Sequence, residues 1–158
     1  MDPRTRPAWV VAAFSAALYL ALVVCAYGFV SLLADIEVVA SASAGPLVGP
    51  AIVAAAVAAL LLHLAVALRT PDRMLGTVLL ASLWTWLAAV VVATIGYAVA
   101  TGTVLASVIF GLGFGIGWFG LLIPALGALV ASLAVLVARG QAGGIERPRW
   151  PWERDDEE

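Results

Sequence analysis

Four long apolar stretches, separated by short polar connections, dominate the pattern of hydrophobic and polar positions along the chain. We place them at residues 9–33, 47–68, 75–100 and 113–138. Each has the length of about 20 residues or more that a helix needs to cross the hydrocarbon core of a bilayer. The pattern therefore predicts an all-α polytopic membrane protein, with one four-helix transmembrane bundle over residues 1–138 and a flexible tail over residues 139–158.

The basic residues of the chain are all arginines, and they lie in only three places along it. These places precede the first stretch, separate the second from the third and follow the fourth: Arg4 and Arg6, Arg69 and Arg73, and Arg139, Arg147, Arg149 and Arg154. Four spans put all three places on one side of the bilayer, and the positive-inside rule makes that side cytoplasmic. The sequence therefore predicts a multi-pass protein with both termini in the cytoplasm.

The apolar segment 101–112, between the third and fourth stretches, is too short to cross a bilayer of about 30 Å as a helix. A complete fifth span would also move the arginine-rich tail to the other side. Two alternatives stay open: a re-entrant or interfacial half-helix around residues 104–110, or long helices that extend beyond the membrane.

Small residues recur at alternating steps of three and four in every stretch, which is the spacing that places them on one helical face. In the fourth stretch they are Gly113, Gly117, Gly120, Pro124, Gly127, Ala131, Ala134 and Ala138. Lipid tails are as apolar as leucine, so helices in a bilayer associate by close contact between small residues. The repeat of 3.5 residues predicts left-handed packing through these small-residue seams, with the fourth helix central and kinked at Pro124.

His63 is the only ionisable side chain well inside a predicted span, and such residues are candidates for function. It shares a helical face with Ala56, Ala59 and Ala67, so it should point into the bundle or at a partner. One hypothesis makes it a proton-responsive or ligand-contacting group. The other makes it a neutral imidazole that is hydrogen-bonded across the hairpin to a hydroxyl such as Ser82 or Thr85.

Trp84 and Trp86 lie deep within the third stretch, where the aromatic residues of a membrane interface do not usually lie. Trp86 is beside the small residues of its helix and Trp84 is nearly opposite them. We expect one of these side chains to pack within the bundle and the other to meet lipid or another subunit, mainly as bulky apolar filling.

Catalytic and metal-binding patterns do not stand out in the chain. Cys25 is the only cysteine, which excludes an intrachain disulfide, and its position suits a small apolar filler. The letters Gly115-Ile-Gly117-Trp-Phe-Gly120 match a dinucleotide fingerprint, but that motif needs a strand before it and an acid about 20 residues later. We therefore expect no enzyme activity, no cofactor, no metal and no catalytic residue.

The predicted tail combines basic and aromatic side chains at Arg147, Arg149, Trp150 and Trp152. Such a segment suits the anionic inner face of a membrane, with the indoles at headgroup depth. Its prolines favour an extended backbone that could equally bind a protein partner. The two acidic clusters of the chain, Asp35 with Glu37 and residues 155–158, do not suggest nucleic-acid binding.

The chain combines several recognisable features: arginine without lysine, abundant alanine and valine, four spans, and an Arg-Pro-Arg-Trp-Pro-Trp tail that ends in acids. It resembles the small uncharacterised polytopic proteins of high-GC actinobacteria. The resemblance implies a bacterial plasma-membrane location and no particular activity. Small multidrug transporters are of similar size, but their first helix carries a glutamate that this first stretch lacks.

Two hypotheses for function follow. The chain could be a non-catalytic accessory or scaffold subunit of a membrane assembly, binding a membrane-protein partner or itself through its small-residue faces and its tail. Alternatively, it could be a homo-oligomeric transporter or channel that uses His63 and the glycine-rich neck from Gly111 to Gly120. Transport usually needs grouped polar ligands near the midplane, and a single histidine favours the first hypothesis.

Overall fold

The computed structural model describes residues 5–39, 44–69 and 74–142, and these form five helices. The helices are α1 (Thr5–Ala34), α2 (Val48–Ala67), α3 (Met74–Thr101), α4 (Val104–Ile116) and α5 (Trp118–Ala142). Four of them, α1, α2, α3 and α5, are long and apolar enough to cross a membrane, whereas α4 has only 13 residues. The predicted all-α fold with four helices of membrane-spanning length is therefore confirmed.

The fourth predicted stretch is not one helix. Helix α4 ends at Ile116, Gly117 has an extended backbone (φ −71°, ψ 165°), and α5 begins at Trp118. Glycine is among the weakest helix formers, so a helix interruption costs little at this position. The predicted start of this helix at Gly113 is thus wrong. The small residues keep their spacing of three and four along the sequence, but those before and after Gly117 belong to two different helices. Helix α5 also continues past the predicted end at residue 138, to Ala142.

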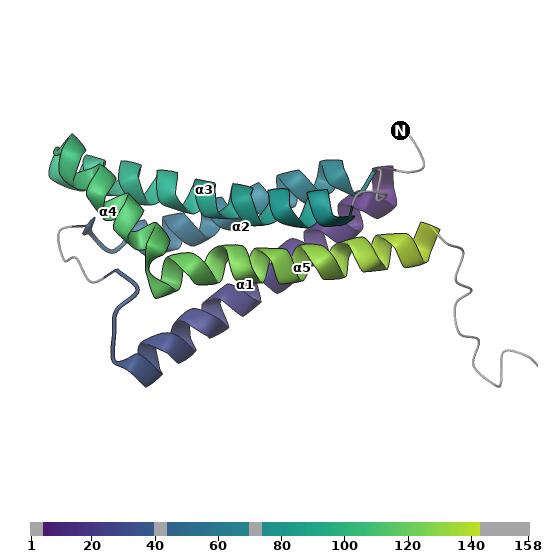
Figure 1. Cartoon of the computed structure of the whole chain (residues 1–158), viewed down its shortest axis with the longest axis horizontal. Coiled ribbons are helices and arrows are strands. Elements are labelled where there is room, and N and C mark those ends of the chain that lie inside the picture. The colour runs from purple at the N-terminus through teal and green to yellow at the C-terminus, as the bar shows by residue number, and fades with distance from the viewer. Residues whose placement is uncertain (1–4, 40–43, 70–73, 143–158) are drawn as a thin grey trace, which may run out of the picture.

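The segment after α3 forms the separate short helix that one alternative expected, although it is longer than residues 104–110. Helix α3 ends at Thr101, and the next residue, Gly102, forms a left-handed cap with a positive φ of 71° and an N–H bond to the Ala98 carbonyl (2.8 Å). The chain then reverses, and α4 packs antiparallel along the second half of α3 (Figure 1). Its 13 residues rise about 20 Å, which is too short to cross a bilayer.

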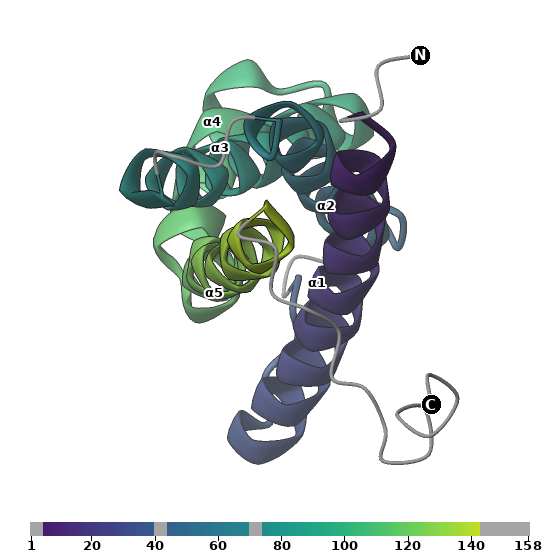
Figure 2. The same cartoon turned by 90° about the vertical axis from the view of Figure 1, so that its right-hand side faces the viewer.

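The four long helices form a ring in which α1 contacts α2, α2 contacts α3, α3 contacts α5, and α5 contacts α1. Helix α4 lies outside this ring, against α3 and α5 (Figures 1 and 2). Helix α5 contacts all four of the other helices, while α3 makes the most extensive contacts, with α2, α5 and α4. The interior is filled by fully buried side chains from every long helix, among them Tyr19, Ile52, Leu60, Thr85, Ile123 and Val130.

The two ends of the bundle carry different charges. Arg69 follows α2 and Arg139 lies in the last turn of α5, next to Met74 at the start of α3 (Nη1 to Sδ, 3.9 Å). The start of α1 lies at this same end, which we call the arginine end (Figure 1). Asp35 and Glu37 follow α1 at the opposite, acidic end, where α1 diverges from α5 (Figure 1).

Candidate functional site

The break between α4 and α5 is the most unusual feature of the bundle, and we call residues 115–124 around it the elbow. An interrupted helix leaves carbonyls without their helical N–H partners, and Pro124 removes one further donor. Inside a bilayer water cannot take the place of those donors, so irregular backbone is tolerated only where protein groups satisfy it or it lines a cavity. The important question at the elbow is therefore which side chains donate hydrogen bonds to its backbone carbonyls.

Helix α3 supplies two of the donors to the elbow. The indole Nε1–H of Trp86 donates to the Gly115 carbonyl (2.9 Å), near the C-terminal end of α4. The Ser82 hydroxyl, one turn earlier on the same face, donates to the Pro124 carbonyl (3.1 Å) in α5. These two hydrogen bonds attach both arms of the elbow to one face of α3.

Helix α1 supplies two more donors, from tyrosines that lie eight residues apart on one face. The Tyr27 hydroxyl donates to the Phe119 carbonyl (2.9 Å), and the Tyr19 hydroxyl donates to the Ile123 carbonyl (3.1 Å). Both tyrosines are buried. The elbow is thus bonded from two sides, by α1 and by α3.

Glycines bring α4 close to α3. A β-carbon at Gly115 would lie 2.7 Å from Cγ2 of Val90, and one at Gly111 would collide with the Thr94 side chain. Real side chains do not approach this closely, so only glycine permits the observed contact between the two helices. Gly111 and Gly115 are both buried, and they form the α4 side of this contact.

The predicted packing residues of the fourth stretch divide at the break. In α5, a β-carbon at Gly120 would lie 2.8 Å from Cα of Gly115, and one at Gly127 would lie 2.9 Å from Oγ1 of Thr85. Ala131, further along the same face, is fully buried. Gly113 instead is exposed with open space around it, because α4 turns its Gly111 and Gly115 face toward α3.

Gly117 and Pro124 act on the local backbone and are not part of the continuous small-residue packing face that the sequence predicted. Gly117 is the residue of the break, and its N–H is shared between the Gly113 and Phe114 carbonyls at 3.1 Å each. Pro124 lies within α5, and its carbonyl accepts the Ser82 bond.

His63 lies in the last third of α2 and is partly buried. Its Nε2 is 3.1 Å from the backbone carbonyl of Thr77 in the first turn of α3, so the ring nitrogen donates across the hairpin. The partner is a carbonyl and not the hydroxyl of Ser82 or Thr85 that the sequence suggested. Thr77 lies about 20 Å along α3 from Val90, the residue under Gly115, so the fold does not bring His63 to the glycine-rich neck.

Buried polar side chains are paired throughout the part of the chain that the structure describes. No buried side-chain nitrogen or oxygen there lacks a hydrogen-bond partner. Nor does that part contain a group of three or more His, Cys, Asp or Glu residues placed to hold a metal ion. Cys25 is exposed on α1.

The predicted surface-contact residues Arg147, Arg149, Trp150 and Trp152 lie outside the described residues. Of the two deep tryptophans, Trp86 packs in the bundle and Trp84 is 49% exposed, which distinguishes the two roles that the sequence left unassigned. The sequence reasoning missed Tyr19 and Tyr27. Their positions on one face of an apolar stretch could have predicted hydrogen bonds to another helix, because a buried tyrosine hydroxyl needs a partner.

The fold and the elbow define a class of protein: a small helical bundle with four helices of membrane-spanning length and one interrupted helix that is hydrogen-bonded from within. The chain belongs to the Family of unknown function (DUF6121), which matches residues 1–158. Neither the curated proteins nor the solved structures gave a match.

Proposed function

We propose that this protein is a non-catalytic accessory or scaffold subunit of an assembly in a bacterial plasma membrane, with both termini in the cytoplasm. The observation that carries the proposal is the elbow, where side chains of α1 and α3 donate to four backbone carbonyls of the same chain. In transporters, interrupted helices typically present free carbonyls and helix ends to a substrate or ion. An elbow held closed from two sides instead favours a bundle with one packed arrangement.

The orientation rests on the distribution of arginines along the sequence; among the described residues, Arg69 and Arg139 lie at the same end of the bundle as the start of α1. The actinobacterial resemblance of the composition supports the plasma membrane as the location. In such an assembly the arginine end would face the cytoplasm and the acidic end the outside.

Partner binding would fall mainly to the tail. Much of the small-residue surface is already used within the chain: a β-carbon at Gly96 of α3, for example, would lie 2.9 Å from Cγ2 of Val48 in α2. The neighbouring guanidinium and indole groups of Arg147, Arg149, Trp150 and Trp152 can instead contact acidic lipid headgroups or a partner at the membrane surface.

The test is extraction of the full chain from native membranes in a mild detergent, followed by sizing and mass spectrometry. The proposal expects a partner in stoichiometric amount that is lost when Arg147, Arg149, Trp150 and Trp152 are all replaced by alanine. Replacing Asp155 and Glu157 by Asn and Gln is the matched control and should keep the partner. An unaccompanied homo-oligomer from native membranes would overturn the proposal.

One observation favours a second candidate, a homo-oligomeric transporter or channel: the helix interruption itself is typical of transport proteins. If it were correct, His63 would act at a separate place near the arginine end, because it lies away from the elbow. Flux into vesicles that contain only this chain, reduced by His63→Ala, would support this candidate.

A further inference from the structure

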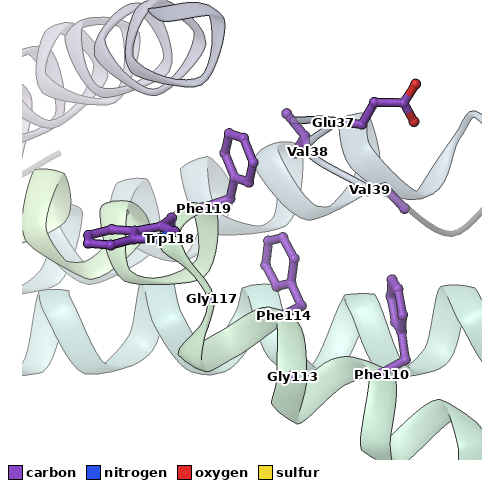
Figure 3. A pocket seen from close by; sticks show the side chains of 9 residues that line it. All are labelled: Glu37, Val38, Val39, Phe110, Gly113, Phe114, Gly117, Trp118 and Phe119. Atoms are coloured by element: carbon purple, nitrogen blue, oxygen red, sulfur yellow. The ribbon is translucent and has the colours of Figure 1, made fainter. Parts of the chain in front are cut away.

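An apolar cleft of about 590 Å³ lies beside the elbow, between the connection that follows α1 and the end of α4 (Figure 3). It is lined by Glu37, Val38, Val39, Phe110, Gly113, Phe114, Gly117, Trp118 and Phe119. Phenyl rings from α4 and α5 form one wall, and the backbone and valines of the connection form the other (Figure 3). Its volume falls in the range of about 300–1,000 Å³ that is usual for small-ligand sites.

The aromatic wall of this elbow cleft is fixed by contacts outside it. Phe110 stacks on Tyr97 of α3, with ring centroids 4.5 Å apart. Phe119 and Tyr27 make a T-shaped contact with ring centroids 5.0 Å apart, and the same tyrosine donates to the Phe119 carbonyl. Aromatic pairs of this kind hold ring orientation, so the cleft is formed before a ligand enters.

The elbow cleft opens among side chains that suit hydrocarbon and not water. Trp118, one of its lining residues, is 76% exposed, and Leu32 and Leu33 in the last turn of α1, before the connection that lines the cleft, are 85% and 84% exposed. In a bilayer this surface faces acyl chains, and an apolar cleft that opens there is filled by a chain at no desolvation cost.

Charge at the mouth of the cleft has a single sign. In Figure 3 the Glu37 carboxylate extends away from the phenyl rings, so it lies at the rim and not in the apolar interior. Asp35 lies two residues earlier, and Arg69 and Arg139 lie at the opposite end of the described bundle. The rim therefore attracts a cationic headgroup and repels a purely anionic one.

We infer that the elbow cleft binds one hydrocarbon chain of a membrane lipid whose headgroup carries an amine, with Glu37 facing the ammonium group. The chain lies along Phe110, Phe114 and Phe119, where close van der Waals contact with the fixed rings supplies most of the affinity. The inference needs only that the bundle lies in a bilayer, and it does not depend on the accessory role.

The first experiment measures lipid retention by native mass spectrometry of the full chain with phosphatidylethanolamine and phosphatidylglycerol of identical acyl chains. Gly113→Leu fills the cleft from a position where a β-carbon meets nothing within 4 Å, so the fold should tolerate it. It should weaken phosphatidylethanolamine retention about tenfold. Gly28→Leu, at an equally open helical glycine that does not line the cleft, is the matched control and should retain lipid like the unmodified chain.

The second experiment tests the headgroup. The unmodified chain should prefer phosphatidylethanolamine by about two- to fivefold, the range expected for an exposed ion pair. Glu37→Gln should bring this preference close to one while total lipid retention persists, and Asp35→Asn should keep most of it. Equal retention by the Gly113→Leu and unmodified chains would overturn the site, and an unmodified chain without headgroup preference would overturn the amine assignment.

Discussion

The indole N–H of Trp86 lies 2.9 Å from the carbonyl oxygen of Gly115, so a side chain of α3 satisfies a backbone acceptor at the C-terminal end of α4. The last four carbonyls of any α-helix lack partners within the helix. Because α4 ends against α3, partway along the long helices (Figure 1), this donor takes the part that water plays at the end of a surface helix.

Trp86→Phe should lower the free energy of unfolding by about 1 kcal/mol, because it removes the donor and keeps most of the apolar volume. Unfolding of the detergent-solubilised protein, followed by circular dichroism, measures this loss. Trp84→Phe is the matched control, two residues away and 49% exposed, and should cost less than about 0.5 kcal/mol. Equal losses for the two variants would refute a specific role for the Trp86 bond.

Gly120→Ala should destabilise the bundle by about 1–3 kcal/mol, because the new methyl group would press on the backbone of α4. The added methyl cannot be relieved by a side-chain rotation, since its neighbours are main-chain atoms of Phe114 and Gly115. Gly113→Ala, in open space, should be neutral or stabilising by up to about 1 kcal/mol. Thermal unfolding of both variants in the same detergent gives the comparison, and a Gly113→Ala loss as large as that of Gly120→Ala would contradict the assigned packing.

Tyr27→Phe should loosen the end of α1, because this hydroxyl is the last bond from α1 to α5 before the two helices diverge. Spin labels at Leu33 and Ile116, which are 84% and 73% exposed, should then give a broader distance distribution. Tyr19→Phe should broaden it less, since the Tyr27 bond remains. Identical distributions in all three proteins would show that the tyrosine bond does not position α1.

Cysteines introduced at Glu37, Thr103 and Gln141 test the topology after Cys25 has been replaced by alanine. An impermeant maleimide applied to intact cells should label the first two and should reach Gln141 only after permeabilisation. Gln141 follows both α4 and α5, so its protection separates a returning half-helix from a complete fifth span, which would move Gln141 to the outside, while Thr103 before α4 marks the outer end of α3 in either case. The opposite pattern at Glu37 and Gln141 would reverse the orientation.

The class of fold followed from the sequence because bilayer thickness sets a length that an apolar stretch either reaches or does not. Close contact at Gly127 was also predictable, since small-residue spacing records which helical face approaches a neighbour. The break at Gly117 was not, because a spacing of three and four takes no account of the backbone angle ψ. It depends on donors such as Trp86 and Tyr27 that reach the elbow from other helices.

The candidate site was harder to predict from the sequence than the fold. His63 stood out by chemistry alone, but its actual partner is a backbone carbonyl, which is present at every residue and leaves no mark in the sequence. The elbow cleft joins residues near 37 with residues near 110 and 119, and only the folded chain shows that these meet.

Helix α4 returns along α3 instead of crossing, and α1 leans away at the same end, so the molecule is broader at its acidic end than at its arginine end (Figure 1). Once inserted, the chain displaces more lipid from one leaflet than from the other. A molecule of this shape fits best where curvature expands the leaflet that holds its acidic end, so the fold itself favours curved over flat bilayers.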